Sequence, residues 1–209
     1  MDRADRAALI LVDIQNDFLP GGALGVPRGD EVIAVANALS PRFEVVVATR
    51  DHHPPDHESF ASRHAGRRVG EVIDLHGLSQ VLWPDHCVQG TAGSELAAGL
   101  DVTRVASVFT KGTDRTIDSY SGFFDNGHRK STGLGDWLRE RGIERVYVLG
   151  LATDYCVKFT ALDARRLGFE VILVEDGCRA VDLQPGDGAR AIEAMRAAGV
   201  QVVRSGEAA

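Results

Sequence analysis

Cysteine is scarce in this sequence, with only Cys87, Cys156 and Cys178 among 209 residues. An odd number of cysteines, without the spacing of a disulfide framework, indicates a reducing compartment. No apolar run approaches the length of a membrane span, and the first run is too short for a secretion signal. We therefore expect a cytoplasmic protein without a membrane segment.

Positive charge is also in deficit, because 23 lysines and arginines stand against 30 aspartates and glutamates, for a formal net charge of -7. Phosphate backbones require a basic surface, so this composition argues against nucleic acid as a partner. Repeats, low-complexity tracts and linker-like segments are missing as well. A chain of this length can build one substantial core, and we expect a single domain over residues 1–209.

The chain alternates between short apolar runs and segments of helical periodicity. The runs typical of buried strands cover residues 7–13, 44–51, 103–111, 145–151, 169–176 and 200–205. Helical spacing occurs at residues 29–39, 134–142, 155–168 and 188–199, with a shorter piece near 93–100 in an otherwise irregular stretch from about 51 to 101. This alternation predicts a three-layer α/β/α fold with a largely parallel sheet between helices.

Four polar side chains end or follow successive strands of the predicted sheet. Asp13 ends the first strand, Asp51 the second and Lys111 the third, and Cys156 comes after the fourth. Ligands of open parallel sheets bind beyond the carboxyl ends of the strands. Each residue alone has an ordinary structural explanation, but their shared edge indicates a functional site.

Cys156 lies where a strand turns into a helix after Gly150, and Thr153 or Asp154 is a natural N-cap. A helix N-terminus favours a thiolate over a thiol, which makes Cys156 a candidate nucleophile. A buried structural cysteine is the alternative.

A cysteine nucleophile needs a base that takes its proton. Asp13 could be that base, and a buried Lys111 would keep the carboxylate and the thiolate ionised together. Backbone N–H groups of residues 150–156 could stabilise the oxyanion of an acyl-transfer intermediate. No histidine follows a strand in a way that indicates a Cys–His pair.

Asp51, His53 and His57 form a D-x-H-x-x-x-H pattern, and His86 follows within W-P-D-H-C. Carboxylate and imidazole ligands suit zinc, iron or manganese and leave a position open for water or substrate. His52 could replace His53 as a ligand, and a polar loop with solvated histidines is the alternative. The position of Asp51 at a strand end favours a metal site near the candidate nucleophile.

Six motifs occur in one order: D-I-Q-N-D-F (13–18), T-R-D-H-H-P (49–54), W-P-D-H-C-V (83–88), F-T-K-G (109–112), S-Y-S-G-F (119–123) and G-L-A-T-D-Y-C-V (150–157). Together they resemble the nicotinamidases (pyrazinamidases) of the isochorismatase-like cysteine hydrolase superfamily, from residue 7 to about residue 203. The resemblance implies a Rossmann-like, six-stranded parallel sheet between helices. It also implies hydrolysis of nicotinamide, and of pyrazinamide, with nicotinate and ammonia formed from nicotinamide for NAD salvage.

The resemblance further implies roles for individual residues. The family's catalytic triad matches Asp13, Lys111 and Cys156, and its oxyanion hole matches the N–H groups of Ala152 and Cys156. A divalent ion, zinc in the first place with iron or manganese as alternatives, matches Asp51, His53 and His86. The peptide bond between Leu151 and Ala152 is cis in the family. The residues that match substrate contacts are Phe18, Trp83, Tyr120 and Leu151.

Two positions depart from the family pattern. Position 52 usually carries an aromatic residue, so His52 leaves the ligand set and the outer pocket less defined. His57 is a ligand in some relatives at a different spacing, so here it is either a fourth ligand or acts behind the ligands through water. The number of subunits is not fixed by the sequence, and a homo-oligomer stays open.

Other functions have weaker support. A related amidase that acts on a small amide without a pyridine ring is less favoured, because the predicted metal would have no evident use there. A true isochorismatase is less favoured because that branch does not use a cysteine at the position of Cys156. GGALG at 21–25 lacks the G-x-G-x-x-G order of a nucleotide-binding domain. A non-catalytic protein with a structural metal stays open.

Overall fold

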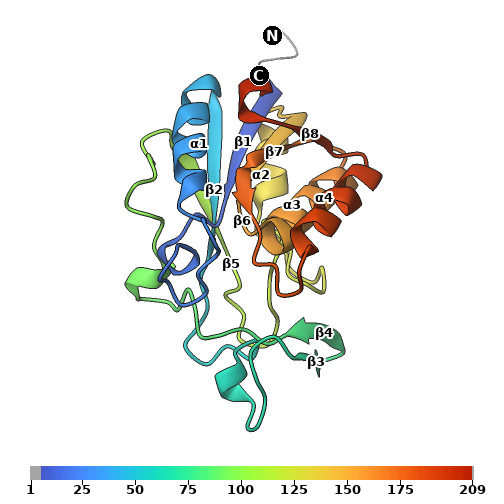
Figure 1. Ribbon diagram of the computed structural model, residues 1–209. Helices are drawn as coiled ribbons and strands as arrows, with labels where there is room; N and C mark the ends of the chain where they lie inside the picture. Colours follow the sequence, from blue (N-terminus) through green and yellow to red (C-terminus); the bar gives the residue numbers. More distant parts are fainter. Residues whose placement is uncertain (1–5, 209) are drawn as a thin grey trace.

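Strands and helices alternate along the chain in the computed structural model, which describes residues 6–208 (Figure 1). The strands of the main sheet are β1 (Ala7–Val12), β2 (Val45–Asp51), β5 (Val105–Lys111), β6 (Arg145–Leu151), β7 (Glu170–Arg179) and β8 (Gln201–Val203). The helices are α1 (Glu31–Leu39), α2 (Leu134–Glu140), α3 (Lys158–Arg166) and α4 (Asp187–Ala197). A π-helical turn, Thr153–Val157, leads into α3.

The main sheet has the strand order β5-β2-β1-β6-β7-β8, and every neighbouring pair is parallel. The predicted six-stranded parallel sheet is therefore confirmed. The chain moves outward in one direction from β1 through α1 to β2, and in the other direction from β6 through α3 to β7. Because such connections are right-handed, α1 covers one face and α3 the other. The order reverses between β1 and β6, which is where ligands of this fold class bind.

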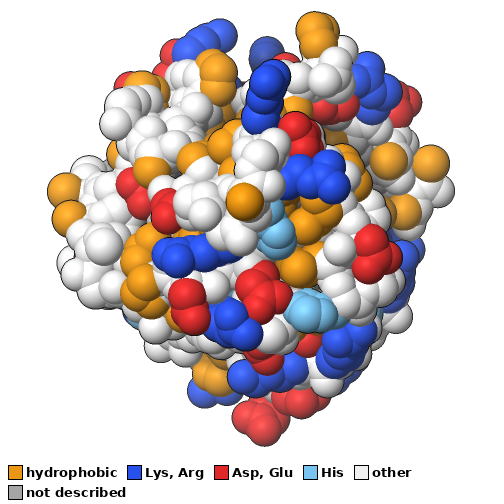
Figure 2. Space-filling view, turned by 90° about the horizontal axis from the view of Figure 1, so that it is seen from below, with side chains coloured by type: hydrophobic (Ala, Val, Ile, Leu, Met, Phe, Trp, Pro, Cys, Tyr) orange, Lys and Arg blue, Asp and Glu red, His pale blue; other side chains and the backbone are white. Residues whose placement is uncertain are grey.

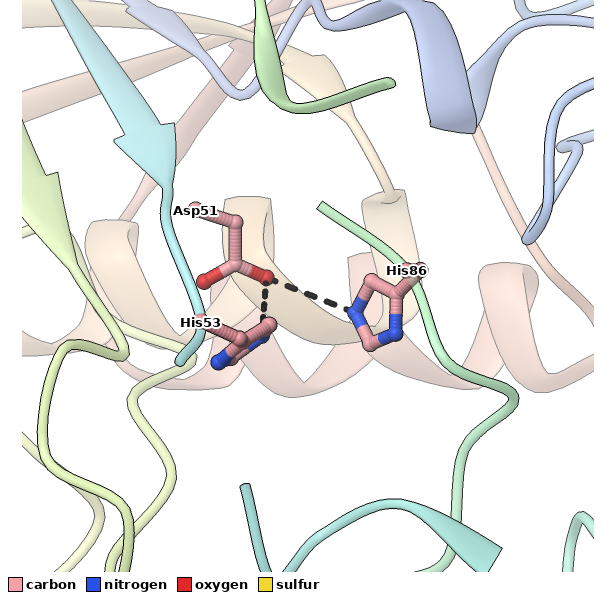
Figure 3. Close-up of side chains that lie close together, drawn as sticks. All are labelled: Asp51, His53 and His86. Carbon is pink, nitrogen blue, oxygen red and sulfur yellow. Dashed lines mark ion pairs between the residues drawn. The ribbon is translucent and has the colours of Figure 1, made fainter. Parts of the chain in front are cut away.

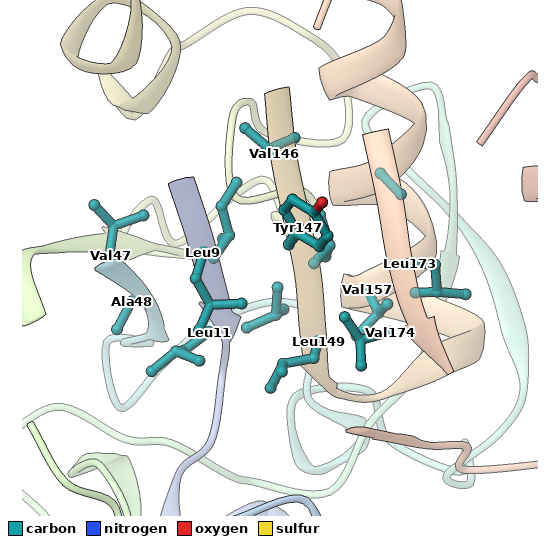
Figure 4. Packing of buried hydrophobic residues seen from close by; sticks show 14 of the residues in the cluster. Leu9, Leu11, Val47, Ala48, Val146, Tyr147, Leu149, Val157, Leu173 and Val174 are labelled. Atoms are coloured by element: carbon teal, nitrogen blue, oxygen red, sulfur yellow. The ribbon is translucent and has the colours of Figure 1, made fainter. Parts of the chain in front are cut away.

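The core explains why these segments form strands. Every residue of β1 is buried, as are most of β2 and β6, so their apolar side chains pack against helices on both faces of the sheet (Figure 4). Leu9, Leu11, Leu149 and Leu173 are among the side chains without solvent exposure. Burying a side chain of this size contributes roughly 1.5–3 kcal/mol to the stability of the fold. The sheet is therefore a stable support for the edge that carries the site.

A second, two-stranded sheet was not predicted. Strands β3 (Val72–Leu75) and β4 (Leu78–Val81) pair as an antiparallel hairpin at the end of the molecule opposite the start of β1 (Figure 1). His76 and Gly77 form its turn with φ of 52° and 84°, the left-handed values that two-residue hairpin turns need. The strands are short and Val72 is exposed, so the segment lacks the apolar run that marks the main strands.

The helical piece predicted near residues 93–100 is wrong. Only a 3-10 turn forms there, at Ala92–Ser94. The backbone of this segment bonds to the loop after β1 instead: Glu95 O accepts from Asn16 N at 3.1 Å, and Ala97 N donates to Ile14 O at 2.8 Å. Those tertiary hydrogen bonds use the groups that a helix would pair internally.

Candidate active site and metal site

The carboxyl ends of β1, β2, β5 and β6 bring four of the predicted side chains together, with Lys111 at the centre of the other three. The Lys111 ammonium lies 2.8 Å from Asp13 Oδ2 and 2.9 Å from Asp51 Oδ1. It also donates to the Ser119 carbonyl oxygen at 2.9 Å and lies 3.5 Å from Cys156 Sγ. All of these residues are buried. A single cation therefore contacts the candidate base, the candidate nucleophile and a candidate metal ligand.

Asp13 is aimed into this cluster by the backbone. Its φ of 48° turns the chain away from the direction of β1. The Thr49 hydroxyl donates to Asp13 Oδ1 at 2.6 Å and accepts from the Asp13 N–H at 3.2 Å. Asp13 Oδ2 is buried and, apart from its ion pair with Lys111, makes no hydrogen bond within residues 6–208. This oxygen is thus available to accept a proton.

The charges of the cluster stabilise one another. Burial raises the pKa of Asp13, and the Lys111 ammonium opposes that rise. Burial acts in the same direction on Asp51, but His53 and Lys111 outweigh it and hold the pKa of that carboxyl well below its usual range. Burial alone would lower the pKa of Lys111, whereas the two carboxylates hold it well above its ordinary value. Lys111 is therefore charged at neutral pH.

Burial acts on the Cys156 thiol in the direction opposite to the expected effect of a helix N-terminus. Burial raises the pKa of the Cys156 thiol well above its ordinary value, and the opposing effect of Lys111 does not cancel it. The negative charges of Asp13 and Asp51 raise it further. A reaction at Cys156 therefore requires transfer of the thiol proton to a base.

The turn between β6 and α3 depends on a glycine. Gly150 has φ of 131°, and a Cβ at this position would overlap the backbone of Val12 in β1. The Leu151–Ala152 peptide bond is cis, as the resemblance implies. The predicted N-cap is wrong, since neither Thr153 nor Asp154 caps the turn with its side chain. The Asp154 carboxylate instead accepts from two backbone N–H groups of the segment after β7.

Asp51, His53 and His86 lie close enough to share one ion (Figure 3). Their potential ligand atoms all lie within 4.8 Å of one another. Asp51 Oδ2 is 3.1 Å from His53 Nε2 and 3.6 Å from His86 Nε2. The other ring nitrogens are held by backbone carbonyls, His53 Nδ1 by Gly112 O at 2.9 Å and His86 Nδ1 by Pro84 O at 2.7 Å. Such contacts orient histidine ligands of metals, so these residues fit a divalent ion.

A second group of potential ligands adjoins the first. It consists of His53, His57 and Asp118, all buried. His57 Nδ1 bonds the Ser59 hydroxyl at 2.7 Å, while His57 Nε2 is buried without a hydrogen-bond partner among residues 6–208. Asp118 was not singled out from the sequence, because it lies in a polar loop without a strand end to mark it.

A cavity of about 20 Å³ lies beside both groups. It is lined by Cys156, Ala152, Asp51, His86 and Asp118, and by a wall of Phe18, Leu24, Trp83, Tyr120, Tyr155 and Val181. Most of this lining is apolar and the polar groups converge at one end, as in small-molecule sites. A larger hollow of about 220 Å³ also touches Lys111 but includes neither Cys156 nor Asp51.

Three of the four predicted substrate contacts line this cavity. Phe18, Trp83 and Tyr120 do so, and Trp83 Nε1 donates to the Tyr120 hydroxyl at 3.1 Å. Leu151 does not, because it has no exposed surface and packs in the core at the end of β6. Tyr155 was missed, although its place beside Cys156 could have indicated it; its ring centroid is 4.7 Å from that of Trp83.

The outer surface mixes both signs of charge on the face shown in Figure 2, and hydrophobic side chains show in a depression near its middle. Among residues 6–208, none of the helices has the length and apolar character needed to cross a membrane.

Comparison with known proteins identifies relatives over nearly the whole chain. Residues 7–207 match the isochorismatase domain. A nicotinamidase from Escherichia coli (strain K12) is 53% identical over 196 residues, which is 92% of each chain. A nicotinamidase and pyrazinamidase structure from Acinetobacter baumanii is 44% identical, with a TM-score of 0.94 over 97% of this chain and 98% of that one. A zinc complex of the pyrazinamidase of Pyrococcus horikoshii is 40% identical, with a TM-score of 0.78 over 95% and 99%.

Proposed function

Since the chain belongs to the isochorismatase domain family, we propose that it is a nicotinamidase, an amidohydrolase that converts nicotinamide into nicotinate and ammonia for NAD salvage. Pyrazinamide is a second substrate of the same site. The observation that carries the proposal is the contact of one buried lysine with a thiol, a carboxylate and a metal-ligand candidate, beside an aromatic cavity. Close nicotinamidase relatives over most of the chain support it.

In the proposed reaction Asp13 is the base and Cys156 the nucleophile. Asp13 Oδ2 takes the thiol proton, and the sulfur attacks the carboxamide carbon to form a tetrahedral intermediate. Asp13 returns the proton to the departing nitrogen, which leaves as ammonia. Asp13 then takes a proton from water, whose oxygen attacks the thioester carbon; the C–S bond breaks, Asp13 returns the proton to the sulfur, and the acid leaves as nicotinate after losing its proton to solvent. Lys111 lies beside both groups and stabilises each charge as it forms.

Backbone and aromatic groups hold the substrate in this proposal. The N–H groups of Ala152 and Cys156 donate to the oxyanion, and Ala152 lines the cavity beside the sulfur. Phe18, Trp83 and Tyr120 enclose the flat ring of the substrate and exclude bulk water. A ring held in this way places the carboxamide against Cys156, which lowers the entropic part of the barrier.

We propose that Asp51, His53 and His86 hold one divalent ion, with zinc favoured over iron and manganese. Two imidazoles and a carboxylate are a common zinc set, and a relative binds zinc. When bound, the ion supplies a Lewis-acid contact for the pyridine nitrogen of the substrate. His57 and Asp118 lie behind His53 and either contribute a further ligand or position bound water.

The remaining features also belong to the proposal. One isochorismatase-like domain over residues 1–209 is supported by the extent of the family match. A cytoplasmic location is supported by three free, buried thiols.

Ammonia release from nicotinamide tests the proposed function. The wild-type protein should release ammonia, and Cys156→Ala should release none while keeping its fold. Cys178→Ala is the matched control, because Cys178 is equally buried but lies in β7 outside the cavity. Absence of ammonia from the wild type loaded with zinc, or full activity in Cys156→Ala, would contradict the proposal.

A further inference from the structure

Gln15 and Asp17 belong to the motif at residues 13–18 but have no part in the proposed reaction. Both contact the segments that carry the candidate metal ligands. We propose that Gln15 and Asp17 are positioning residues for the divalent ion: they contribute no ligand atom but fix the backbones that present Asp51 and His86. The inference rests on the proposed metal site and adds to it the residues that set its geometry.

Gln15 pairs with the backbone of Asp51 as a neighbouring strand would. Its Oε1 accepts from the Asp51 N–H at 2.7 Å, and its Nε2 donates to the Asp51 carbonyl at 2.8 Å. The same Nε2 donates to Ser94 O at 2.8 Å, and the side chain has no exposed surface. The chain turns away from β1 at Asp13, and the pairing of β1 with β2 ends before Asp51. The backbone of β1 therefore provides no hydrogen-bond partner for Asp51. The Gln15 amide fills that place.

Asp17 fixes the other ligand segment through Cys87, the residue after His86. Asp17 Oδ2 accepts from the Cys87 N–H at 2.7 Å. Cys87 has φ of 46°, a left-handed conformation that is unfavourable for a side-chain residue unless its surroundings hold it. The Cys87 carbonyl in turn accepts from the His53 N–H at 2.9 Å. Cys87, whose N–H donates to Asp17, thus links His86 to His53.

A glycine makes room for this contact. A Cβ on Gly93 would overlap the Asp17 carboxylate, although the backbone conformation of Gly93 is one that alanine also adopts. Gly93→Ala therefore displaces Asp17 from Cys87 without changing Asp17 itself, and Gly93 is only half-buried. Gln15 Nε2 also lies 3.4 Å from Cys87 Sγ, so the two positioning side chains converge on one residue.

Zinc affinity is the direct readout of this proposal. Loss of groups that orient metal ligands typically weakens metal binding by roughly 10–100-fold, and we expect this range for Gln15→Met, Asp17→Ala and Gly93→Ala. Asp17→Asn keeps an oxygen acceptor for the Cys87 N–H and should bind zinc nearly as tightly as the wild type. Zinc dissociation constants are measured by competition with a chromophoric chelator, and cobalt-substituted protein reports ligand geometry through its visible absorption.

Asn16→Ala is the matched control. Asn16 lies between the two positioning residues and bonds the same loop, donating from Nδ2 to Ala92 O at 2.8 Å, but it reaches no ligand segment. It should keep the wild-type zinc affinity and cobalt spectrum. Thermal unfolding of each metal-free variant shows that the protein is folded before zinc is added.

Wild-type zinc affinity and an unchanged cobalt spectrum in folded Gly93→Ala and Asp17→Ala would overturn the proposal, as would an equal loss in Asn16→Ala. Gly93→Ala keeps the test decisive if Gln15→Met does not fold. A wild type that binds zinc but releases no ammonia would contradict the proposed function alone. A wild type that releases ammonia, with variants that bind zinc normally, would contradict this inference alone.

Discussion

Replacing Lys111 with methionine tests the electrostatic centre of the site. The Lys111 side chain has no exposed surface, and its ammonium lies 2.8 Å from Asp13 Oδ2 and 2.9 Å from Asp51 Oδ1. Methionine keeps most of the apolar stem but removes the charge, so two buried carboxylates lose their shared counter-ion. Removing one partner of a buried ion pair costs roughly 3–5 kcal/mol. At about 2–4 °C per kcal/mol for a chain of this size, the melting temperature should fall by roughly 6–20 °C.

The loss of stability in Lys111→Met should depend on pH in a defined direction. Burial already raises the pKa of Asp13 in the folded protein, and Lys111 opposes that rise. Without the lysine, the folded pKa lies further above the unfolded value of about 3.9. The folded state then binds more protons than the unfolded state, so stability is present at low pH and is lost as the pH rises through the folded pKa. The deficit should be smaller at pH 5 than at pH 8.

Urea unfolding of chelator-treated protein at both pH values measures this deficit, because a bound metal would itself neutralise Asp51. Lys130→Met is the control, since Lys130 is exposed and makes no ion pair within the described part of the chain. A loss below about 1 kcal/mol in Lys111→Met, or the same loss at both pH values, would refute the role given to Lys111.

Three further changes follow from the same geometry. Gly112→Ala should weaken zinc binding and nicotinamide hydrolysis together, because a Cβ at this φ of 64° would lie 2.7 Å from His53 Nδ1 and 2.8 Å from Asp51 Oδ1; equal zinc affinity by chelator competition would contradict this. Tyr120→Phe removes the acceptor of the Trp83 N–H and should raise the KM for nicotinamide more than it lowers kcat, at a cost in unfolding free energy of about 1–3 kcal/mol. Saturating the protein with zinc at 100 times its dissociation constant should raise the unfolding free energy by about 2.7 kcal/mol over chelator-treated protein, and no shift in calorimetry would argue against the metal site.

The parts of the site that lie at strand ends could be predicted from sequence. Asp13, Asp51 and Lys111 each adjoin an apolar run, so a parallel sheet puts them at one edge whatever the order of the strands. The reversal of strand order between β1 and β6, which places Asp13 beside the Cys156 turn, is a long-range pairing that no local periodicity encodes. The sequence analysis made no prediction of this strand order.

The groups missed by the sequence analysis are those whose position depends on irregular backbone. Asp118 reaches the cavity from a polar loop. Its carboxylate accepts a hydrogen bond at 2.9 Å from Nε2 of Gln80, which lies in the hairpin that was not predicted. The surroundings of Cys156 depend on packing in the same way. Its nearness to a helix start could be read from the sequence, but its burial beside Asp13 could not, and burial raises the pKa of the thiol.

The charges in the site explain why a metal and a buried lysine occur together. Asp13, Asp51 and Asp118 bring three carboxylates into one buried region, and Lys111 is the cation that contacts two of them. Burying carboxylates in excess of cations is costly, so these side chains favour a divalent cation before any substrate is considered. Asp51 contacts both Lys111 and the histidines. A cation bound between Asp51 and the histidines would neutralise the Asp51 carboxylate, so that the charge of Lys111 would act mainly on Asp13 and the sulfur of Cys156. Metal binding and the readiness of Asp13 as a base are therefore coupled through one carboxylate, and that coupling predicts that Asp51→Asn impairs both zinc affinity and the chemical step.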